Sequence, residues 1–306
     1  MKICVFGNKH LTKEFIELCF SQGVPIDTLI CISTSEVDTK QISGFDSYLA
    51  SHAKSLGCRI FFAKKYSLND EASLKFFAEE KFDLGICLGW QRLIPGEILK
   101  TFSNGVFGWH GSLFKFPNGR GRSPINWSIR LGAKKIYLNL FRYDSEADNG
   151  ALYETIGVDI GPNEYVSEVQ KRLVFIQKDS FLRLISSIKN RTLLLKEQPV
   201  GPFIMFPKLS EESGFVEVAK ITRDEALNIV RSCSRPFPGA FVVSESKEFK
   251  LRIWRACAID SSEFTIEKYN LRKTFDAYLI RFCDGLIQVD DYEELYGDVS
   301  FVERLS

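Results

Sequence analysis

Short apolar runs alternate with amphipathic stretches along the N-terminal part of the chain. Uninterrupted apolar runs predict buried strands, and stretches with helical periodicity between them predict helices. The expected strands are Lys2–Gly7, Thr28–Ile32, Cys58–Phe62 and Leu84–Leu88, and the expected helices are Leu11–Gln22, Ser47–Leu56 and Asp70–Glu80. Apolar runs without alternation are typical of strands covered on both faces. The pattern therefore predicts an α/β fold, a Rossmann-like parallel sheet between layers of helices.

Ligands of such sheets bind beyond the carboxyl ends of the strands. In this chain those positions are the segments after Gly7, after Leu88 and after Trp109. The first strand is not followed by the G-x-G-x-x-G pattern that cradles a dinucleotide pyrophosphate. We therefore do not expect NAD as a cofactor.

The C-terminal part has a different pattern. A long helix is expected over Tyr165–Lys189, and Pro199, Pro202 and Pro207 then crowd one short stretch, which indicates a linker. After it come an expected helix, Arg223–Cys233, and the expected strands Ala240–Ser244, Lys250–Ala258, Tyr278–Cys283 and Leu286–Val289. We predict a catalytic domain over residues 1–205 and a smaller β-rich, OB-like domain over residues 206–306.

Composition narrows the function classes. The 306 residues are 45% hydrophobic, and their 26 Phe predict an aromatic core. The net charge is only +1, and residues 206–306 hold 14 Lys and Arg against 18 Asp and Glu. Because nucleic-acid binding depends on a basic surface, a nucleic-acid partner is not expected.

The eight cysteines form no C-x-x-C pair, so we expect reduced core thiols and no metal site. The N-terminus lacks the features of a signal peptide. No apolar stretch reaches the ~18 residues that a membrane span needs. A cytoplasmic protein without membrane association is therefore expected.

The chemistry-bearing residues concentrate between Gly105 and Gly150. This stretch contains Gly108–Ser112 (GWHGS), Pro117–Pro124 (PNGRGRSP) and Ala147–Gly150 (ADNG). In order and spacing these segments resemble the folate-dependent formyltransferase family, whose pattern is N-x-H-x-S, R-G-x-x-P and D-x-G. The loop Leu113–Asn118 is slightly longer than in that pattern.

Two further segments carry the same resemblance. Leu88–Pro95 resembles the family loop that holds the pterin ring, and Arg235–Phe241 resembles the signature that opens its small C-terminal domain. The resemblance implies transfer of a formyl group from 10-formyltetrahydrofolate to a primary amine, without a metal. It implies that His110 acts as the base and that Asp148 orients its imidazole.

The resemblance also implies the binding residues. The expected folate contacts are Trp90, Gln91, Arg92, Leu93, Ile94, Arg120 and Gly121. The expected acceptor-substrate contacts are Gly108, Ser112 and Arg122.

Gly108 departs from the family pattern, which has Asn two positions before the His. That amide is the expected donor to the oxygen that becomes negative during transfer, and losing such a donor costs about 10²–10³ in rate. The candidate substitutes are Gln91, Asn118, Asn149, a backbone N–H and protonated His110 itself. The departure leaves a non-catalytic folate-binding relative as an alternative.

The acceptor amine is expected to belong to an amino-sugar nucleotide of polysaccharide biosynthesis. Methionyl-tRNA is the alternative, but the loop Ser33–Lys40 is not basic, whereas tRNA enzymes of this family carry a basic insertion there. Other amines, such as a hydroxyornithine or a peptide N-terminus, stay open. So does hydrolysis of 10-formyltetrahydrofolate, in which water replaces the amine. The resemblance also allows a homodimer.

Overall fold

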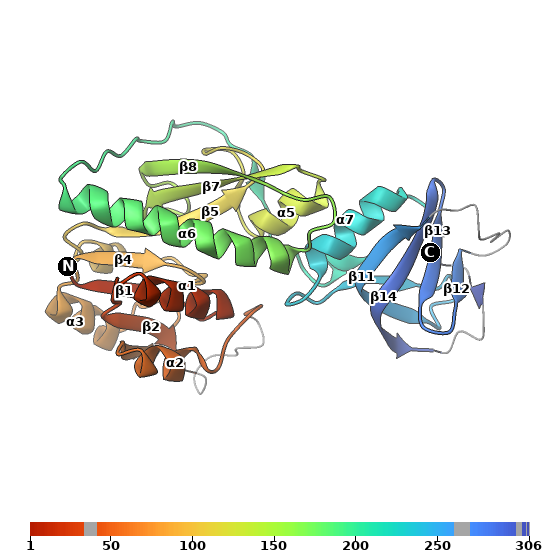
Figure 1. The fold of residues 1–306 in the computed structure, drawn as a ribbon, viewed down its shortest axis with the longest axis horizontal. Coiled ribbons are helices and arrows are strands. Elements are labelled where there is room, and N and C mark those ends of the chain that lie inside the picture. The colour runs from red at the N-terminus through yellow and green to blue at the C-terminus, as the bar shows by residue number, and fades with distance from the viewer. Residues whose placement is uncertain (34–41, 260–269, 298–301, 304, 306) are drawn as a thin grey trace. The chain divides into compact units, whose positions relative to one another are not determined.

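The computed structural model describes residues 1–33, 42–259, 270–297, 302–303 and 305 (Figure 1). Residues 34–40, on which the prediction about a basic insertion depends, lie outside this part. The chain forms two compact units. One comprises residues 1–121, 137–158 and 170–205, and the other comprises residues 122–136, 159–169 and 206–306. The division into domains at 1–205 and 206–306 stays a prediction.

The first unit is built on a seven-stranded sheet with the order β3-β2-β1-β4-β5-β7-β8. Its strands are β1 (Ile3–Phe6), β2 (Thr28–Ile32), β3 (Arg59–Ala63), β4 (Leu84–Cys87), β5 (Val106–Ser112), β7 (Lys135–Arg142) and β8 (Leu152–Asp159). The pairs from β3 through β5 are parallel, and β7 runs antiparallel to β5. The Rossmann-like prediction is thus confirmed for a mostly parallel sheet.

Helices connect the parallel strands by crossovers, as the alternating pattern predicts. They are α1 (His10–Ser21), α2 (Leu49–Ser55), α3 (Glu71–Glu80) and α4 (Gly96–Leu99), and the long α6 (Val166–Lys189) follows the last strand, β8. Three short elements lie at or beyond the bounds of this unit: β6 (Arg120–Gly121) at its edge, α5 (Pro124–Arg130) in the second unit, and β9 (Met205–Phe206) at the boundary between the two ranges. Among the described helices none is long and apolar enough to cross a membrane.

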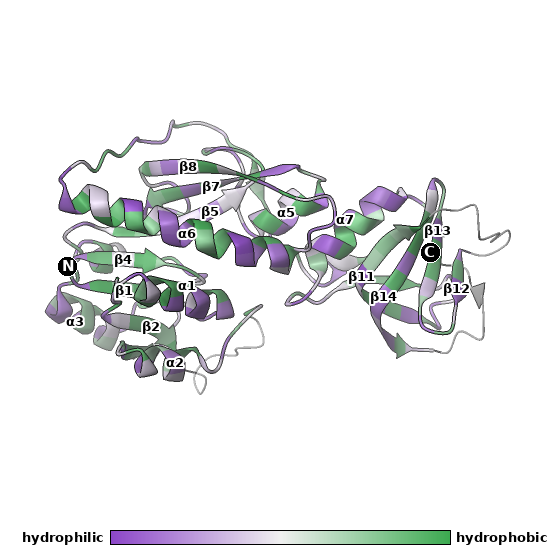
Figure 2. Ribbon diagram, viewed as in Figure 1, coloured by the Kyte–Doolittle hydropathy of each residue, from purple (hydrophilic) through white to green (hydrophobic). Residues whose placement is uncertain are grey.

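The central strands β1 and β4 are fully buried, and their sequences are continuous apolar runs (Figure 2). On one face Val5 and Phe107 pack with Phe15 of α1 and Phe181 of α6. On the other face the aromatic core that composition predicts is present, and the rings of Phe6, Phe77, Phe82 and Phe102 lie within 6.2 Å of one another in successive pairs.

Six of the eight cysteines are buried and free, whereas Cys257 and Cys283 are exposed. Burial raises the pKa of Cys19 and of Cys31 to about 12. These buried thiols are therefore neutral packing groups at physiological pH.

The second unit contains an antiparallel sheet with the order β10-β11-β14-β13-β12-β15. Its strands are β10 (Ala240–Val243), β11 (Lys250–Ile259), β12 (Leu271–Lys273), β13 (Tyr278–Phe282), β14 (Gly285–Tyr296) and β15 (Val302–Glu303). Helix α7 (Arg223–Cys233) begins at a capping box formed by Thr222 and Glu225, and its Ala226 and Val230 pack into the sheet core. A short 3₁₀ turn, Glu212–Gly214, precedes this helix. The predicted β-rich region is confirmed.

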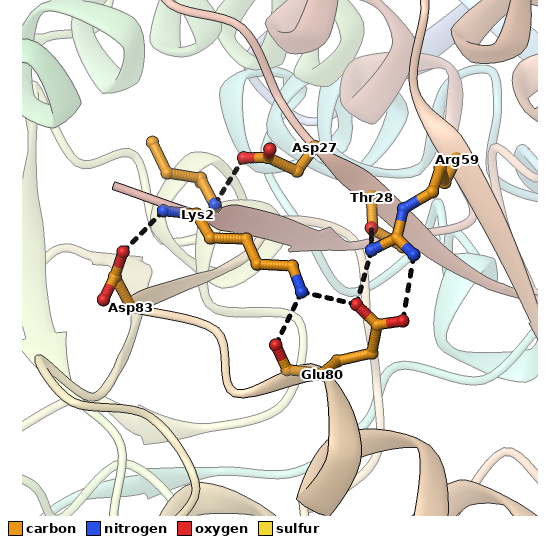
Figure 3. Close-up of polar contacts among 7 residues, drawn as sticks. Lys2, Asp27, Thr28, Arg59, Glu80 and Asp83 are labelled. Atoms are coloured by element: carbon orange, nitrogen blue, oxygen red, sulfur yellow. Dashed lines mark hydrogen bonds and ion pairs between the residues drawn. The ribbon is translucent and has the colours of Figure 1, made fainter.

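An ion cluster joins the starts of β1 and β3 to the end of α3 (Figure 3). The Glu80 carboxylate accepts hydrogen bonds from Lys2 Nζ at 2.5 Å and from both terminal nitrogens of Arg59, at 2.9 and 2.5 Å. The neighbouring Asp27 and Asp83 accept from the backbone N–H groups of Ile3 and Lys2. The contacts of Arg59 and Lys2 lower the pKa of Glu80 to about 2.

We predict that Glu80→Gln lowers the free energy of unfolding at pH 7 by about 1 kcal/mol, since the cluster is partly open to solvent. A depressed carboxyl pKa contributes stability above its ordinary value of 4.5 and loses it as the pH falls toward 2. Urea titrations of the two proteins should therefore converge below pH 4. Glu79→Gln, which removes only an exposed i,i+4 contact with Lys75, is the control and should change little. A constant difference from pH 7 to pH 3 would contradict this assignment.

Candidate active site

His110 lies within β5, which extends past the expected end at Trp109 to Ser112. Alternation along the strand places Gly108, His110 and Ser112 on one face. The imidazole is 7% exposed and lies 5.1 Å from the Phe116 ring, centroid to centroid. Its Nε2 lies 2.7 Å from the carbonyl oxygen of Gly119. A carbonyl only accepts, so Nε2 carries the proton in this arrangement.

Asp148 faces the other ring nitrogen. Its Oδ1 lies 3.5 Å from His110 Nδ1, and its Oδ2 accepts a 3.0 Å hydrogen bond from Gly121 N–H. Burial alone would raise the pKa of the Asp148 carboxyl, but the His110 contact, the Gly121 N–H and the Arg120 charge together hold that pKa below its ordinary value. The carboxylate is therefore ionised at neutral pH and can orient the imidazole.

The backbone at Asp148 takes a conformation that few residues adopt. Its φ is +56°, in the left-handed region that Asp tolerates better than most side chains. Two residues later, a Cβ on Gly150 would lie 1.6 Å from the carbonyl oxygen of Arg142. The D-x-G spacing is thus a steric requirement of the turn that aims the carboxylate at His110.

Arg120 holds this turn from the other side. Its guanidinium is buried, donates to Gln198 Oε1 at 2.7 Å and lies 4.6 Å from the Phe203 ring. Gln198 in turn donates to the carbonyl oxygens of Gly150 and Asp148, at 2.7 and 3.1 Å. Arg120 therefore braces the Asp148 turn, and its contact with folate stays a prediction.

Asn139 is a site residue that the sequence analysis missed. It is fully buried on β7 opposite His110, and its Nδ2 donates to the His110 carbonyl oxygen at 3.2 Å. Thr155 donates to its Oδ1 at 2.8 Å. The available signal was a single polar residue inside the apolar run Tyr137–Phe141. Asn139 fixes the backbone that carries the imidazole.

The expected folate loop follows β4. Trp90 is 7% exposed and packs edge-on against Tyr66, whereas Leu93 is 57% exposed and Ile94 is buried. Tyr66 accepts from the Gln91 N–H at 2.9 Å, and the exposed Arg92 lies over the same ring. Within the described part of the chain, the buried Trp90 Nε1–H has no acceptor. A buried donor without an acceptor, next to the exposed Leu93 and Arg92, suits a flat heterocycle with several acceptors, and contacts of Trp90, Gln91, Arg92, Leu93 and Ile94 with a pterin stay predictions.

The expected acceptor contacts are dispersed. Ser112 is fully buried, and its hydroxyl accepts from Phe114 N–H at 3.4 Å. Arg122 belongs to the second unit, where its side chain is exposed and its N–H donates to the Phe206 carbonyl. Contacts of both residues with an acceptor stay predictions. In the ranges that the structure covers, no group of His, Cys, Asp and Glu has the arrangement of a metal site.

We predict that Gly150→Ala destabilises the protein by more than about 2 kcal/mol, because its methyl group would overlap the Arg142 carbonyl. Gly96→Ala is the matched control, since a Cβ at Gly96 meets nothing within 4 Å. Thermal unfolding of both variants measures the difference. Equal melting temperatures would contradict the steric account of the turn.

Comparison with known proteins identifies the family of the chain. A model of the formyl transferase family matches residues 1–185. The methionyl-tRNA formyltransferase of Thermotoga neapolitana is 29% identical over 196 residues, which are 64% of this chain and 61% of that protein. The aligned part thus spans about three fifths of the relative's own length.

Solved structures show the same fold. Aquifex aeolicus HypX in complex with tetrahydrofolic acid superposes with a TM-score of 0.69 at 15% identity, over 99% of this chain and 46% of that one. A Helicobacter canadensis N-formyltransferase in complex with folinic acid and dTDP-3-aminofucose superposes with a TM-score of 0.64 at 16% identity, over 95% of this chain and 99% of that one. Since the family match covers more than half of its residues, the chain belongs to the formyl transferase family.

Proposed function

We propose that this protein is an N-formyltransferase that moves a formyl group from 10-formyltetrahydrofolate to a primary amine. The observation that carries the proposal is the His110–Asp148 pair, held on a bent turn by Gly121, Gln198 and Arg120. A folate donor is further supported by the family match, by the fit of the Trp90 loop, and by the tetrahydrofolic acid bound to HypX.

The residues divide the work of the transfer. The folate supplies a formyl carbon that an amine nitrogen can attack. An imidazole with its proton on Nδ1, facing Asp148, has a free lone pair on Nε2 for the amine proton. In the structure Nε2 carries the proton and donates it to the Gly119 carbonyl, so Nε2 must first release that proton to solvent as Nδ1 takes one up, and its lone pair must then turn to the amine. The accepted proton goes on to the folate nitrogen as its bond to the formyl carbon breaks.

For the acceptor we propose an amino-sugar nucleotide. The net charge of residues 206–306, 14 basic against 18 acidic side chains, disfavours a phosphate backbone as partner of that region. The Helicobacter canadensis N-formyltransferase, which aligns along nearly its whole length, is described with dTDP-3-aminofucose. One observation favours methionyl-tRNA instead, namely that the Thermotoga neapolitana relative is a methionyl-tRNA formyltransferase.

The first experiment measures tetrahydrofolate formation from 10-formyltetrahydrofolate with and without thymidine-, uridine- and guanosine-diphospho amino sugars. We expect turnover that depends on one class of these acceptors. Turnover without any acceptor would indicate a hydrolase, and turnover with methionyl-tRNA alone would overturn the sugar assignment. His110→Ala should abolish turnover, and an unchanged rate would contradict its role as base.

We predict that Asp148→Asn lowers kcat by about 10²–10⁴, as loss of an imidazole-orienting carboxylate does. Because the pKa of Asp148 lies below its ordinary value of 3.8, the carboxylate is ionised throughout the neutral range. The factor should therefore be the same at every pH from 6 to 9, which a pH–rate profile of both proteins measures. A factor that vanishes at one end of this range would contradict a purely orienting role. Asp276→Asn, at an exposed position of the second unit, is the control.

A further inference from the structure

A tyrosine covers the position where the family pattern has asparagine. A Cβ built on Gly108 would lie 2.4 Å from the Tyr143 hydroxyl oxygen and 2.7 Å from two of its ring carbons. Tyr143 follows β7 directly, and its backbone N–H donates to the Val106 carbonyl at 2.7 Å. The phenol therefore lies over Gly108, on the strand face that also carries His110.

The distance of the hydroxyl from the Cβ position matches that of an amide nitrogen. In an asparagine side chain the amide nitrogen is about 2.4 Å from Cβ, by ordinary bond lengths and angles. Adjacent side chains on one strand face are separated by about 7 Å, which places this hydroxyl one step along β5 from His110. We propose that the Tyr143 hydroxyl is the hydrogen-bond donor to the formyl oxygen during transfer, in place of an asparagine amide. This inference rests on the proposed formyl transfer.

The hydroxyl is in the right chemical state for this role. Burial, the neighbouring Cys87 and the charge of Asp148 raise the pKa of Tyr143 well above its ordinary value, so the phenol keeps its proton. Its contact in the structure is with Cys87, whose own pKa burial raises to about 12. The thiol hydrogen points to the Trp90 carbonyl at 4.0 Å, which leaves a neutral sulfur as a weak acceptor for the phenol. Replacing that acceptor with a developing oxyanion is favourable.

Two other amides near the site already donate hydrogen bonds. The Asn139 amide donates to the carbonyls of His110 and Tyr137, and the Asn149 amide donates to Asp144. Asn118 uses its side-chain oxygen to accept from Ile204 N–H. The contacts of these amides stabilise loops and strand ends, whereas the Tyr143 hydroxyl has only a thiol to give up.

Electron flow in this step is simple. As the amine nitrogen bonds to the formyl carbon, the electron pair of the carbonyl moves onto its oxygen, where the Tyr143 O–H donates a hydrogen bond. Tyr143 keeps its proton throughout. When the bond from carbon to the folate nitrogen breaks, the pair returns and the carbonyl re-forms. No oxidant, metal or further reactant is needed.

The test removes the hydroxyl while keeping the ring. Tyr143→Phe should lower kcat by about 10²–10³, the usual effect of losing one such donor, and should leave the KM for the folate unchanged. Binding of 5-formyltetrahydrofolate, followed by fluorescence, should also be unchanged. Tyr153→Phe is the matched control, because its hydroxyl bonds Ser187 at 2.8 Å and its ring packs with the core on the other face of the sheet. A kcat for Tyr143→Phe equal to that of the wild type overturns the proposal. A loss of folate affinity as large as the loss in kcat overturns it as well.

A swap of the two residues tests the same idea by gain of function. Gly108→Asn alone should be inactive, because its Cβ would overlap the Tyr143 ring. The double variant Gly108→Asn, Tyr143→Ala should have a kcat at least tenfold higher than that of Tyr143→Ala alone. No recovery by a folded double variant counts against equivalence of hydroxyl and amide. A wild type that neither transfers formyl nor releases formate contradicts the proposed function itself, whereas wild-type turnover retained by Tyr143→Phe contradicts the donor role alone.

Discussion

The contact between the Asp148 carboxylate and His110 depends on a turn that only this sequence spacing permits. The backbone of Asp148 is in the left-handed region, and Gly150 lies against the Arg142 carbonyl. The Gln198 side chain accepts a hydrogen bond from Arg120 and donates to two carbonyl oxygens of the turn. These groups come from three stretches of chain, namely residues 142–150, Arg120 and Gln198. The catalytic geometry is therefore a property of the folded unit, and loss of any support moves the carboxylate relative to the imidazole.

Gly108 and Tyr143 form a second dependency. A side chain at Gly108 and a phenol at Tyr143 exclude each other, because the Cβ position lies 2.4 Å from the hydroxyl oxygen. In our proposal, the hydrogen-bond donor comes from Tyr143, directly after β7, and not from position 108 on the neighbouring strand β5. The chain can therefore lack the asparagine and still place a protonated group beside His110. The departure from the family pattern then changes the side chain that supplies the hydrogen bond and leaves its position nearly the same.

The local apolar pattern was sufficient to predict β1, β2, β3, β4 and the helices between them, because each apolar run forms one strand of the same sheet. It did not predict β7 and β8, whose mixed sequences contain no uninterrupted apolar run, although β7 pairs antiparallel with β5. Order and spacing singled out His110 and Asp148, which the structure brings to within 3.5 Å of each other. Gln198, Asn139 and Tyr143 were not, since their roles depend on which distant segment the fold brings beside the site. The glycine at position 108, where the family pattern has asparagine, was the available signal that another side chain occupies the space beside it.

The most direct test of the central claim follows the formyl carbon itself. The protein is supplied with 10-formyltetrahydrofolate carrying ¹³C in the formyl group, together with the amino-sugar nucleotides, and the label is located by NMR. The account predicts that the label leaves the folate and appears in an N-formyl amide on the acceptor, at a rate that depends on His110 and Asp148. Label that stays on the folate, or that appears as free formate, would contradict it.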